Sequence, residues 1–239
     1  MKIIPLILDF ISPRFCVSCN ITLFTDESFI CKECYQKISL LQDHEIQTEF
    51  DRKFKIDNLV DDYNSLFLFE EKGPLQDLIH NLKYNQKYKI GIFLGEELGK
   101  GKKDIITNWE VDTIIPIPLF HLKKVERGYN QAMYIAKGLS KISEIKINGT
   151  VVKRVKNTLS QTKLSNNERK GNMSKAFKVT NSQNIQGKNI IIIDDVITTG
   201  TTVIELAKVL KENGANKVFS LSVATPPFLH SIGGSDTEN

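Results

Sequence analysis

The sequence lacks several features that define whole classes of protein. It has no stretch of roughly 18 to 20 apolar residues, so no membrane span is expected. The opening residues 1–11 are apolar, but they are interrupted by Pro5 and Asp9 and lack a small-residue cleavage site, which argues against a signal peptide. We expect this segment to form an apolar helix that docks on the core of a cytoplasmic protein. Nothing in the chain repeats internally.

The composition is otherwise that of a globular protein, with 41% hydrophobic and 25% charged residues among 239. A chain of this length can bury one sizeable core and still carry a small accessory unit. The net charge of +4 is compatible with a nucleic-acid or phosphorylated partner. A lysine-rich solvated surface explains the same charge without any partner.

Cysteine is scarce, and the four residues of this type form two pairs, Cys16 with Cys19 and Cys31 with Cys34. Two Cys-x-x-Cys pairs with eleven residues between them bring four thiolates within reach of one tetrahedral Zn²⁺ ion. Two structural disulfides are an alternative, but disulfides are uncommon without secretion, and a redox motif needs only one pair. Four thiolates leave no coordination position for water, so the pattern favours a structural zinc site over a catalytic one.

The most informative stretch is 190–202, where an apolar run leads into two carboxylates and then into a hydroxyl-rich turn. Ile190 to Ile193 are β-branched and lack polar alternation, which predicts a strand buried on both faces of a parallel sheet. Asp194 and Asp195 follow at its carboxyl end, where open α/β sheets bind their ligands. Neighbouring carboxylates at such a point repel each other unless a cationic or hydroxyl-bearing group lies between them.

The turn after the two aspartates supplies successive backbone N–H groups, four hydroxyl groups and a glycine, from Thr198, Thr199, Gly200, Thr201 and Thr202. Apolar residues then recur at helical spacing, Thr202 and Glu205 have the spacing of a capping box, and Gly214 is placed to end the helix. A helix N-terminus with unpaired N–H groups favours a phosphate by charge and by geometry. The alternative is a strand-turn-helix junction whose threonines only cap the helix.

The rest of the chain predicts alternating strands and helices. Residues 40–57 are polar and form a candidate linker, and Gly73 with Pro74 starts a helix that ends near Lys83. Residues 156–173 are polar and basic, and a loop of this length inside a compact domain is usually an active-site cover or disordered. The patterns also predict strands at 58–69, 112–116, 151–155, 188–194 and 217–223, helices near 90–98 and 133–139, a loop at 119–126 and a disordered tail at 225–239.

The strand, the two aspartates, the turn and the helix together resemble the signature of the type I phosphoribosyltransferase fold, whose members bind phosphoribosyl pyrophosphate (PRPP). The resemblance implies that Asp194 and Asp195 hold the ribose 2′ and 3′ hydroxyls and that the turn from Thr198 to Thr202 holds the 5′-phosphate. It also implies that Mg²⁺ arrives with the pyrophosphate. The expected fold class is α/β, with a type I phosphoribosyltransferase-like parallel sheet and helices on both faces, preceded by a small zinc-binding module.

Three further segments make the resemblance more specific: I-P-I-P at 115–118, R-G-Y-N-Q at 127–131 and S-Q-T-x-L-S-x-x-E-R-x-x-N at 160–172. With the cysteine pairs, they resemble the ComF family of competence proteins (ComFC type), over nearly the whole chain. The resemblance implies three parts, which are an N-terminal helix with a zinc finger at 1–42, a phosphoribosyltransferase-like domain at 55–224 and a disordered tail at 225–239.

The resemblance also suggests roles for polar residues outside the signature. We expect the pyrophosphate side to include Lys83, Lys123 and Arg127, and a flexible hood loop over PRPP to include Gln161 and Arg169. Lys83 could instead be a cation favoured at a helix C-terminus, and Lys123 could belong to an ordinary basic loop. No residue is an obvious general base, so no catalytic residue is assigned.

The implied function is the cytoplasmic handling of incoming single-stranded DNA during natural transformation, with PRPP as a bound ligand. Other competence proteins, such as a DNA-uptake helicase, would be partners, and the loop cations would make single-strand binding depend on salt. The alternative is an active phosphoribosyltransferase in nucleotide metabolism, whose acceptor the sequence does not identify. A PRPP-sensing regulator would need a DNA-reading motif such as a helix-turn-helix, and the sequence shows none.

Overall fold

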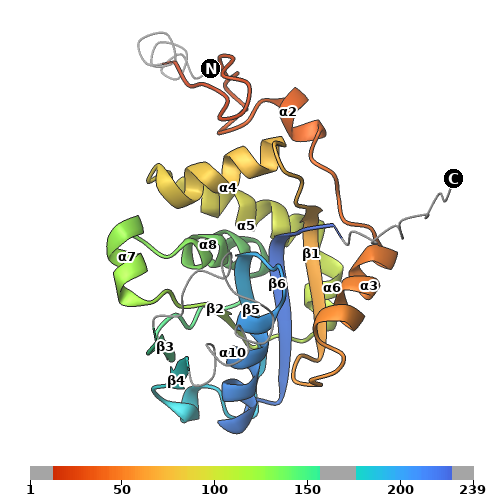
Figure 1. Cartoon of the computed structure of the whole chain (residues 1–239), viewed down its shortest axis with the longest axis vertical. Coiled ribbons are helices and arrows are strands. Elements are labelled where there is room, and N and C mark those ends of the chain that lie inside the picture. Colours follow the sequence, from red (N-terminus) through yellow and green to blue (C-terminus); the bar gives the residue numbers. More distant parts are fainter. Residues whose placement is uncertain (1–12, 157–175, 228–239) are drawn as a thin grey trace, which may run out of the picture.

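The computed structural model describes residues 13–156 and 176–227. Within these ranges, the centre of the molecule is a four-stranded sheet in the order β1-β6-β5-β2, and all of its strands are parallel (Figure 1). Its strands are β1 (Asp62–Leu68), β2 (Thr113–Pro116), β5 (Asn189–Val196) and β6 (Lys217–Thr225). A separate antiparallel pair consists of β3 (Val152–Arg154) and β4 (Phe177–Val179).

Helices cover both faces of this sheet, as the predicted fold class requires (Figure 1). One face packs against α4 (Pro74–Tyr84), α5 (Lys89–Gly101) and α8 (Gln131–Ser143), and the other against α3 (Asp43–Lys53) and α10 (Thr201–Glu212). The shorter elements are α2 (Lys32–Gln36), α6 (Lys103–Asn108), α7 (His121–Arg127) and the 3₁₀ turn η2 (Ser182–Asn184). None of the helices in the described part is long and apolar enough to cross a membrane.

The central strand β5 joins the two cores of the protein. Ile191 and Ile193 lie in the core formed with α4, α5 and α8, while Ile190 and Ile192 lie in the core formed with α10. All four side chains are fully buried, because successive side chains of a strand point to opposite faces and both faces are covered. The prediction of a doubly buried strand is therefore confirmed.

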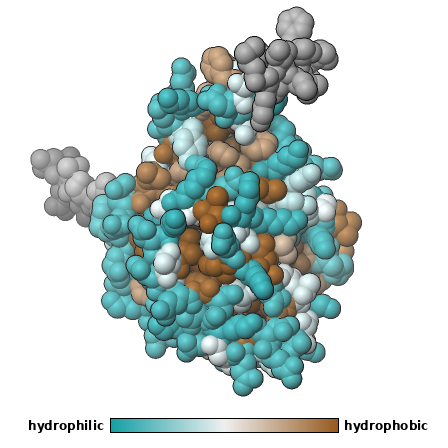
Figure 2. Space-filling view, turned by 180° about the vertical axis from the view of Figure 1, so that it is seen from behind, coloured by the Kyte–Doolittle hydropathy of each residue, from teal (hydrophilic) through white to brown (hydrophobic). Residues whose placement is uncertain are grey.

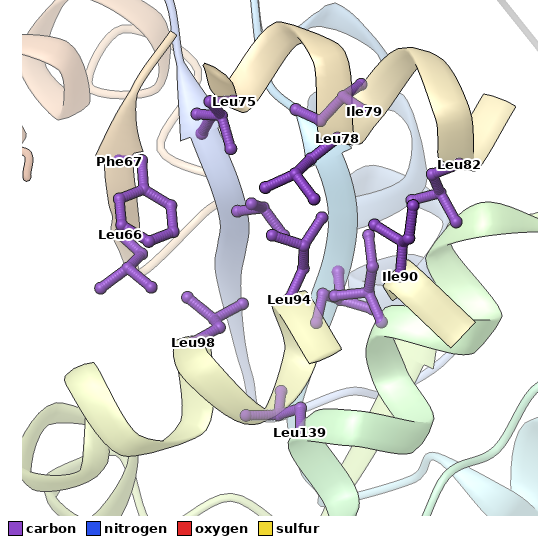
Figure 3. Close-up of a cluster of buried hydrophobic side chains, with 14 of the residues drawn as sticks. Leu66, Phe67, Leu75, Leu78, Ile79, Leu82, Ile90, Leu94, Leu98 and Leu139 are labelled. Atoms are coloured by element: carbon purple, nitrogen blue, oxygen red, sulfur yellow. The ribbon is translucent and has the colours of Figure 1, made fainter. Parts of the chain in front are cut away.

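The core on the α4 side is built largely from leucine and isoleucine. Side chains from α4, α5 and α8 converge there between the helices and the sheet (Figure 3). The α4 positions are those with helical spacing in the sequence, and Pro74 occupies the first turn of the helix as predicted. Seen from behind, most of the surface is hydrophilic, and apolar side chains gather mainly near the middle of that face (Figure 2).

Helices α5 and α8 approach each other closely at two glycines. A Cβ atom on Gly95 would lie 2.0 Å from the Ile135 carbonyl oxygen, and one on Gly138 would lie 2.0 Å from the Ile92 carbonyl oxygen. No other residue fits at either position unless the helices move apart. This contact fixes the position of α8, whose N-terminus borders the site described below.

The chain covers both edges of the sheet with short segments outside the named strands. At the β1 edge, Leu40 bridges Phe67 in an antiparallel sense, and the Leu41 N–H donates to the Leu66 carbonyl at 3.0 Å. At the β2 edge, Ile147 bridges Ile114 in a parallel sense. Both edges therefore have backbone hydrogen-bond partners from neighbouring segments.

The prediction of a polar linker at 40–57 is wrong, because most of this segment is helix α3. The Gln42 and Glu45 side chains form a capping box at its start, and Ile46, Glu49 and Lys53 are buried on its inner face. The segment is polar in composition because the buried side of this amphipathic helix itself includes a charged pair, Glu49 and Lys53.

Smaller differences concern element ends. The predicted loop at 119–126 is mostly helix α7, and helix α10 begins at Thr201 with Gly200 as N-cap, so Thr202 does not form the predicted capping box. Strand β6 extends to Thr225, which is buried and therefore does not belong to the tail. The sequence patterns did not predict α6 or β4. The predicted N-terminal helix, most of the hood loop and residues 228–239 lie outside the described residues.

Candidate functional site

The carboxyl ends of β2 and β5 border the point where the chain's connections diverge. From β2 the chain runs through α8 to Ile147 on the outer side of β2, whereas from β5 it runs through α10 to β6 on the other side. In open α/β sheets, ligands bind in the crevice at such a point. A cavity of about 120 Å³ lies there. Its walls are formed by Lys83, Ile117, Leu119, Arg127, Asn130, Gln131, Ala132, Arg154, Asp194, Asp195 and Thr202.

The two aspartates at the end of β5 both line this cavity. The Asp195 N–H donates to Asp194 Oδ1 at 2.9 Å, and the Val196 N–H donates to Asp195 Oδ1 at 2.8 Å. Each carboxylate is thus oriented by the next backbone N–H along the chain. The rest of each carboxylate is available to partners from other elements.

Lys83 gives the two carboxylates different protonation behaviour. Its ammonium lies 2.6 Å from Asp195 Oδ2. Burial would raise the pKa of Asp195, but the charge and hydrogen bond of Lys83 outweigh burial and lower it. Burial raises the pKa of Asp194 to about 7, and the charge on Asp195 contributes in the same direction. The pair therefore contains one ionised carboxylate and one that takes up a proton near neutral pH.

Three cationic side chains from different elements meet at this cavity. Lys83 comes from the end of α4, Arg127 from the end of α7 and Arg154 from β3. Arg127 is held by its hydrogen bond to Gln131 Oε1, at 3.1 Å, and its guanidinium lies 5.7 Å from the centre of the Tyr84 ring. Two arginines and a lysine beside paired carboxylates are suited to an anionic ligand that also carries hydroxyl groups.

The predicted phosphate-binding turn follows directly after β5. Gly200 has φ +76, a left-handed conformation that favours glycine, and its α-carbon faces the Phe54 ring, where a Cβ atom would lie 2.8 Å from Phe54 Cε1. The Thr199 and Thr201 hydroxyls lie 3.0 Å apart, and Thr202 lines the cavity, whereas Thr198 is exposed. The first N–H groups of α10 have no partner within the helix, so they can bind an anion.

Helix α3 supports this turn from behind. The Lys53 ammonium donates to the Ile197 carbonyl at 2.7 Å and to the Thr225 hydroxyl, and it pairs with Glu49 Oε2 at 2.7 Å. The side chains of Lys53 and Glu49 are 0% and 3% exposed. Burial lowers the pKa of Lys53 to about 8, although Glu49 acts in the opposite direction. A buried ion pair thus holds the residue that immediately precedes the threonine turn.

Sequence reasoning assigned no role to Arg154 or to Lys53. Arg154 was visible as a cation in a short strand, but only the fold brings it to the cavity. Lys53 belonged to the segment interpreted as a linker, and the i, i+4 spacing of Glu49 and Lys53 was the available signal.

The other predicted residues differ in their placement. Lys123 is half-buried outside the cavity lining, and burial lowers its pKa, with Arg154 and Arg127 adding to the effect. Its sensitivity to these charges places Lys123 within electrostatic reach of the site. Gln161 and Arg169 lie outside the described residues. Larger hollows exist elsewhere, such as one of about 490 Å³ beside Lys103 and Glu144, but they lack this convergence of charges from several elements.

The four cysteines form a second candidate site, at the N-terminal end of the described chain. Their Sγ atoms all lie within 4.8 Å of one another, and none of the four is in a disulfide. A tetrahedral zinc with Zn–S bonds of about 2.3 Å separates its sulfurs by about 3.8 Å, and Cys19 and Cys31 Sγ are 3.6 Å apart. Burial and the neighbouring thiols raise the pKa of Cys34 to about 12, which a divalent cation would reverse. The donor set fits a metal ion.

The parallel sheet, its paired carboxylates and the glycine-threonine turn before α10 define a protein with the phosphoribosyltransferase fold. Residues 125–227 match the family model for the phosphoribosyl transferase domain. Among solved structures, the glutamine PRPP amidotransferase from B. subtilis has a TM-score of 0.41 and 19% sequence identity to this chain, and the match covers 60% of this chain and 28% of that one.

The curated relatives are more specific. The chain is 34% identical to Competence protein F of Haemophilus influenzae over 149 residues, which is 61% of this chain and 65% of the relative. It is 33% identical to DNA utilization protein YhgH of Escherichia coli K12 over 150 residues, which is 61% of this chain and 64% of the relative. The chain is thus similar to these competence and DNA utilization proteins over about three fifths of its length, in line with the resemblance of its motifs. It spans slightly less than two thirds of the length of these relatives.

Proposed function

We propose that this protein binds PRPP together with Mg²⁺ and acts in the handling of single-stranded DNA during competence. The observation that supports PRPP as the ligand is the convergence of Asp194, Asp195, Lys83, Arg127 and Thr202 around one crevice. The biological role is supported by the names of the relatives, which are a competence protein and a DNA utilization protein.

The charges of the crevice fit the parts of PRPP. Asp194 and Asp195 would accept hydrogen bonds from the ribose hydroxyls, and the turn before α10 would bind the 5′-phosphate through backbone N–H groups and hydroxyls. Lys83 and Arg127 would face the pyrophosphate, with Arg154 as a further cation. Mg²⁺ dehydrates reluctantly, so it would keep phosphate, ribose and water oxygens as most of its ligands.

Phosphoribosyl transfer is a second candidate function, and one observation favours it. A carboxyl group with a pKa of about 7, such as Asp194, can exchange a proton with a reacting group near neutral pH. Cations around the pyrophosphate would stabilise it as it leaves. A test is the release of pyrophosphate from PRPP in the presence of candidate bases.

For the four cysteines, we propose a structural Zn²⁺ ion. Its ligands would be Cys16, Cys19, Cys31 and Cys34 as thiolates, and a site with four thiolates has no open position for a substrate. The ion would stabilise the fold of the segment that contains the two Cys-x-x-Cys pairs. Elemental analysis of the purified protein should give close to one zinc per chain, and a metal-free protein that is fully folded would refute this assignment.

The PRPP site is tested by calorimetry with PRPP and Mg²⁺ on an Asp194→Ala, Asp195→Ala double variant. We expect binding to fall below detection, while a control variant at an exposed carboxylate away from the crevice, Asp57→Ala, binds like wild type. Unchanged affinity in the double variant would show that the ligand binds elsewhere. The DNA role is tested by measuring single-strand affinity with and without PRPP and Mg²⁺ across a range of salt concentrations.

A further inference from the structure

Four tyrosines lie beside the crevice, and none of them has a role in the proposed PRPP site. Tyr84 ends α4, Tyr88 precedes α5, Tyr129 lies between α7 and α8, and Tyr134 is in α8. The ring centre of Tyr88 lies 4.8 Å from that of Tyr134 and 6.2 Å from that of Tyr129. We call these four residues, with Lys87, Lys89 and Lys137, the tyrosine surface.

Two of the four tyrosines are exposed to solvent. Tyr84 is 57% exposed and Tyr88 is 41% exposed. The position of the Tyr129 ring is fixed by its hydroxyl, which donates a hydrogen bond to the Leu82 carbonyl in α4. Tyr84 and Tyr88 are therefore exposed beside helices α4, α5 and α8, whereas Tyr129 and Tyr134 are half-buried between them.

The surface is also positively charged. Lys87, Lys89 and Lys137 are exposed, and the Lys137 ammonium lies 4.4 Å from the centre of the Tyr134 ring. The two stretches that build the surface, 84–92 and 127–143, contain no aspartate or glutamate. A polyanion approaching these segments would meet cations and aromatic rings without an acidic residue of either segment to repel it.

The tyrosine surface adjoins the crevice at two residues. Tyr84 directly follows Lys83, which pairs with Asp195, and the Tyr84 ring lies 5.7 Å from the Arg127 guanidinium. Arg127 lines the crevice. A chain bound along the tyrosines would therefore pass the mouth of the PRPP site.

We propose that the tyrosine surface binds single-stranded DNA. This inference rests on the DNA role proposed above and specifies where the strand binds. Proteins that bind single strands combine cations for the backbone with aromatic rings on which bases stack, and both groups are present here. An acidic peptide would match the lysines but would leave the exposed faces of Tyr84 and Tyr88 without a planar partner.

The test uses the full chain and a fluorescently labelled oligothymidine, followed by anisotropy. Replacing Tyr88 by leucine keeps an apolar side chain but removes the aromatic face, and we expect affinity to fall about tenfold. Lys87→Ala with Lys89→Ala should weaken binding and reduce the salt slope by about 0.7 for each phosphate that the variant no longer neutralises. Double-stranded DNA of the same length should bind more weakly, because its bases are already stacked on each other.

Two matched controls use residues remote from this surface in the chain. Phe24→Leu removes an aromatic ring that is 73% exposed within the segment of the four cysteines, 16–34, which we call the cysteine module, and Lys208→Ala removes an exposed cation of α10. Both should leave affinity for the oligonucleotide unchanged. If Phe24→Leu reduces affinity and Tyr88→Leu does not, the strand binds the cysteine module and the inference is overturned.

A Tyr88→Trp variant gives a direct reading of stacking that does not depend on a loss of affinity. This variant should bind like wild type, and its tryptophan fluorescence, compared with that of wild-type protein, which contains only the buried Trp109, should be quenched by oligothymidine and restored by high salt. Binding without quenching would refute stacking at this position. A wild-type protein that binds PRPP but no single-stranded DNA would refute the DNA role and this inference together, whereas DNA binding that all these variants retain would refute the inference alone.

Discussion

The buried ion pair behind the threonine turn offers the most demanding test of the structure. Replacing Lys53 by methionine leaves the Glu49 carboxylate, whose side chain is 3% exposed, without its buried partner. Breaking a buried pair on one side typically costs about 3–5 kcal/mol. Two interactions reduce the cost here, because Arg52 still lies 2.5 Å from Glu49 and the Thr225 hydroxyl still donates to the Ile197 carbonyl at 3.0 Å. We therefore expect a destabilisation of about 3 kcal/mol, at the lower end of that range.

The measurement is urea unfolding at pH 7 for a double-mutant cycle. Replacing Lys53 by methionine and Glu49 by leucine together removes both charges, so the double variant should be within about 1 kcal/mol of wild type. A double variant that costs the sum of the two single changes would refute the reasoning, since the charges would then not be coupled. Lys53→Met should also weaken PRPP binding, because the Ile197 carbonyl before the turn loses its Lys53 donor, and calorimetry with PRPP and Mg²⁺ would measure this effect. A conservative Phe50→Leu change on the same helix serves as a control for general loosening of α3.

Three further predictions concern separate parts of the molecule. The pKa of Asp194 is about 7 in the folded protein, whereas the ordinary value is 3.8. The folded state therefore binds more protons than the unfolded state between these pH values, and the protein loses stability as pH rises through this range. Asp194→Asn should remove this loss, so urea unfolding should show the ligand-free variant to be more stable than wild type at pH 8 but not at pH 4. Gly138→Ala places a Cβ atom against the backbone of the facing helix and should lower the free energy of unfolding by about 2 to 3 kcal/mol, as measured by thermal unfolding. Gly101→Ala meets only the tip of the Leu66 side chain and should lower it by less. Equal effects would contradict the close contact between the helices. Cys34→Ser should lower the zinc content and destabilise the cysteine module. Limited proteolysis of zinc-loaded protein, with and without a chelator, will detect this destabilisation. Protease resistance that changes neither with the substitution nor with the chelator would refute a structural metal.

Local signals explain most of what could be predicted from the sequence. The run from Ile190 to Ile193 predicts a strand covered on both faces, because β-branched residues favour strands and the run has no polar residue for an exposed face. The two aspartates follow it without a gap, so their place at the strand end comes with the strand. The two cysteines of each pair are likewise close in space because they are three positions apart in the chain. These features depend on residues that are close in the chain.

The features that were missed depend on contacts between distant segments. Arg154 reaches the crevice only because β3 lies beside it, and nothing in its neighbours signals that placement. Lys53 is separated from Ile197 by 144 positions, and its burial depends on how α3 packs against the sheet. Charged residues are usually on the surface, so the polar composition around Lys53 favours a linker over a buried helix.

The covered edge of β1 has a consequence for any attempt to study the phosphoribosyltransferase-like domain alone. An exposed edge strand offers unpaired N–H and C=O groups to other chains, and β1 carries the largely buried sequence Asp62–Leu68. The segment that pairs with it, 39–41, belongs to the connection from the cysteine module. A truncated protein that starts at Gln42 would keep α3 but lose residues 39–41, so it would present this edge to solvent and should self-associate through strand addition, which light scattering would detect. The segment that connects the cysteine module to the sheet would then protect the protein against aggregation, whatever the module itself binds.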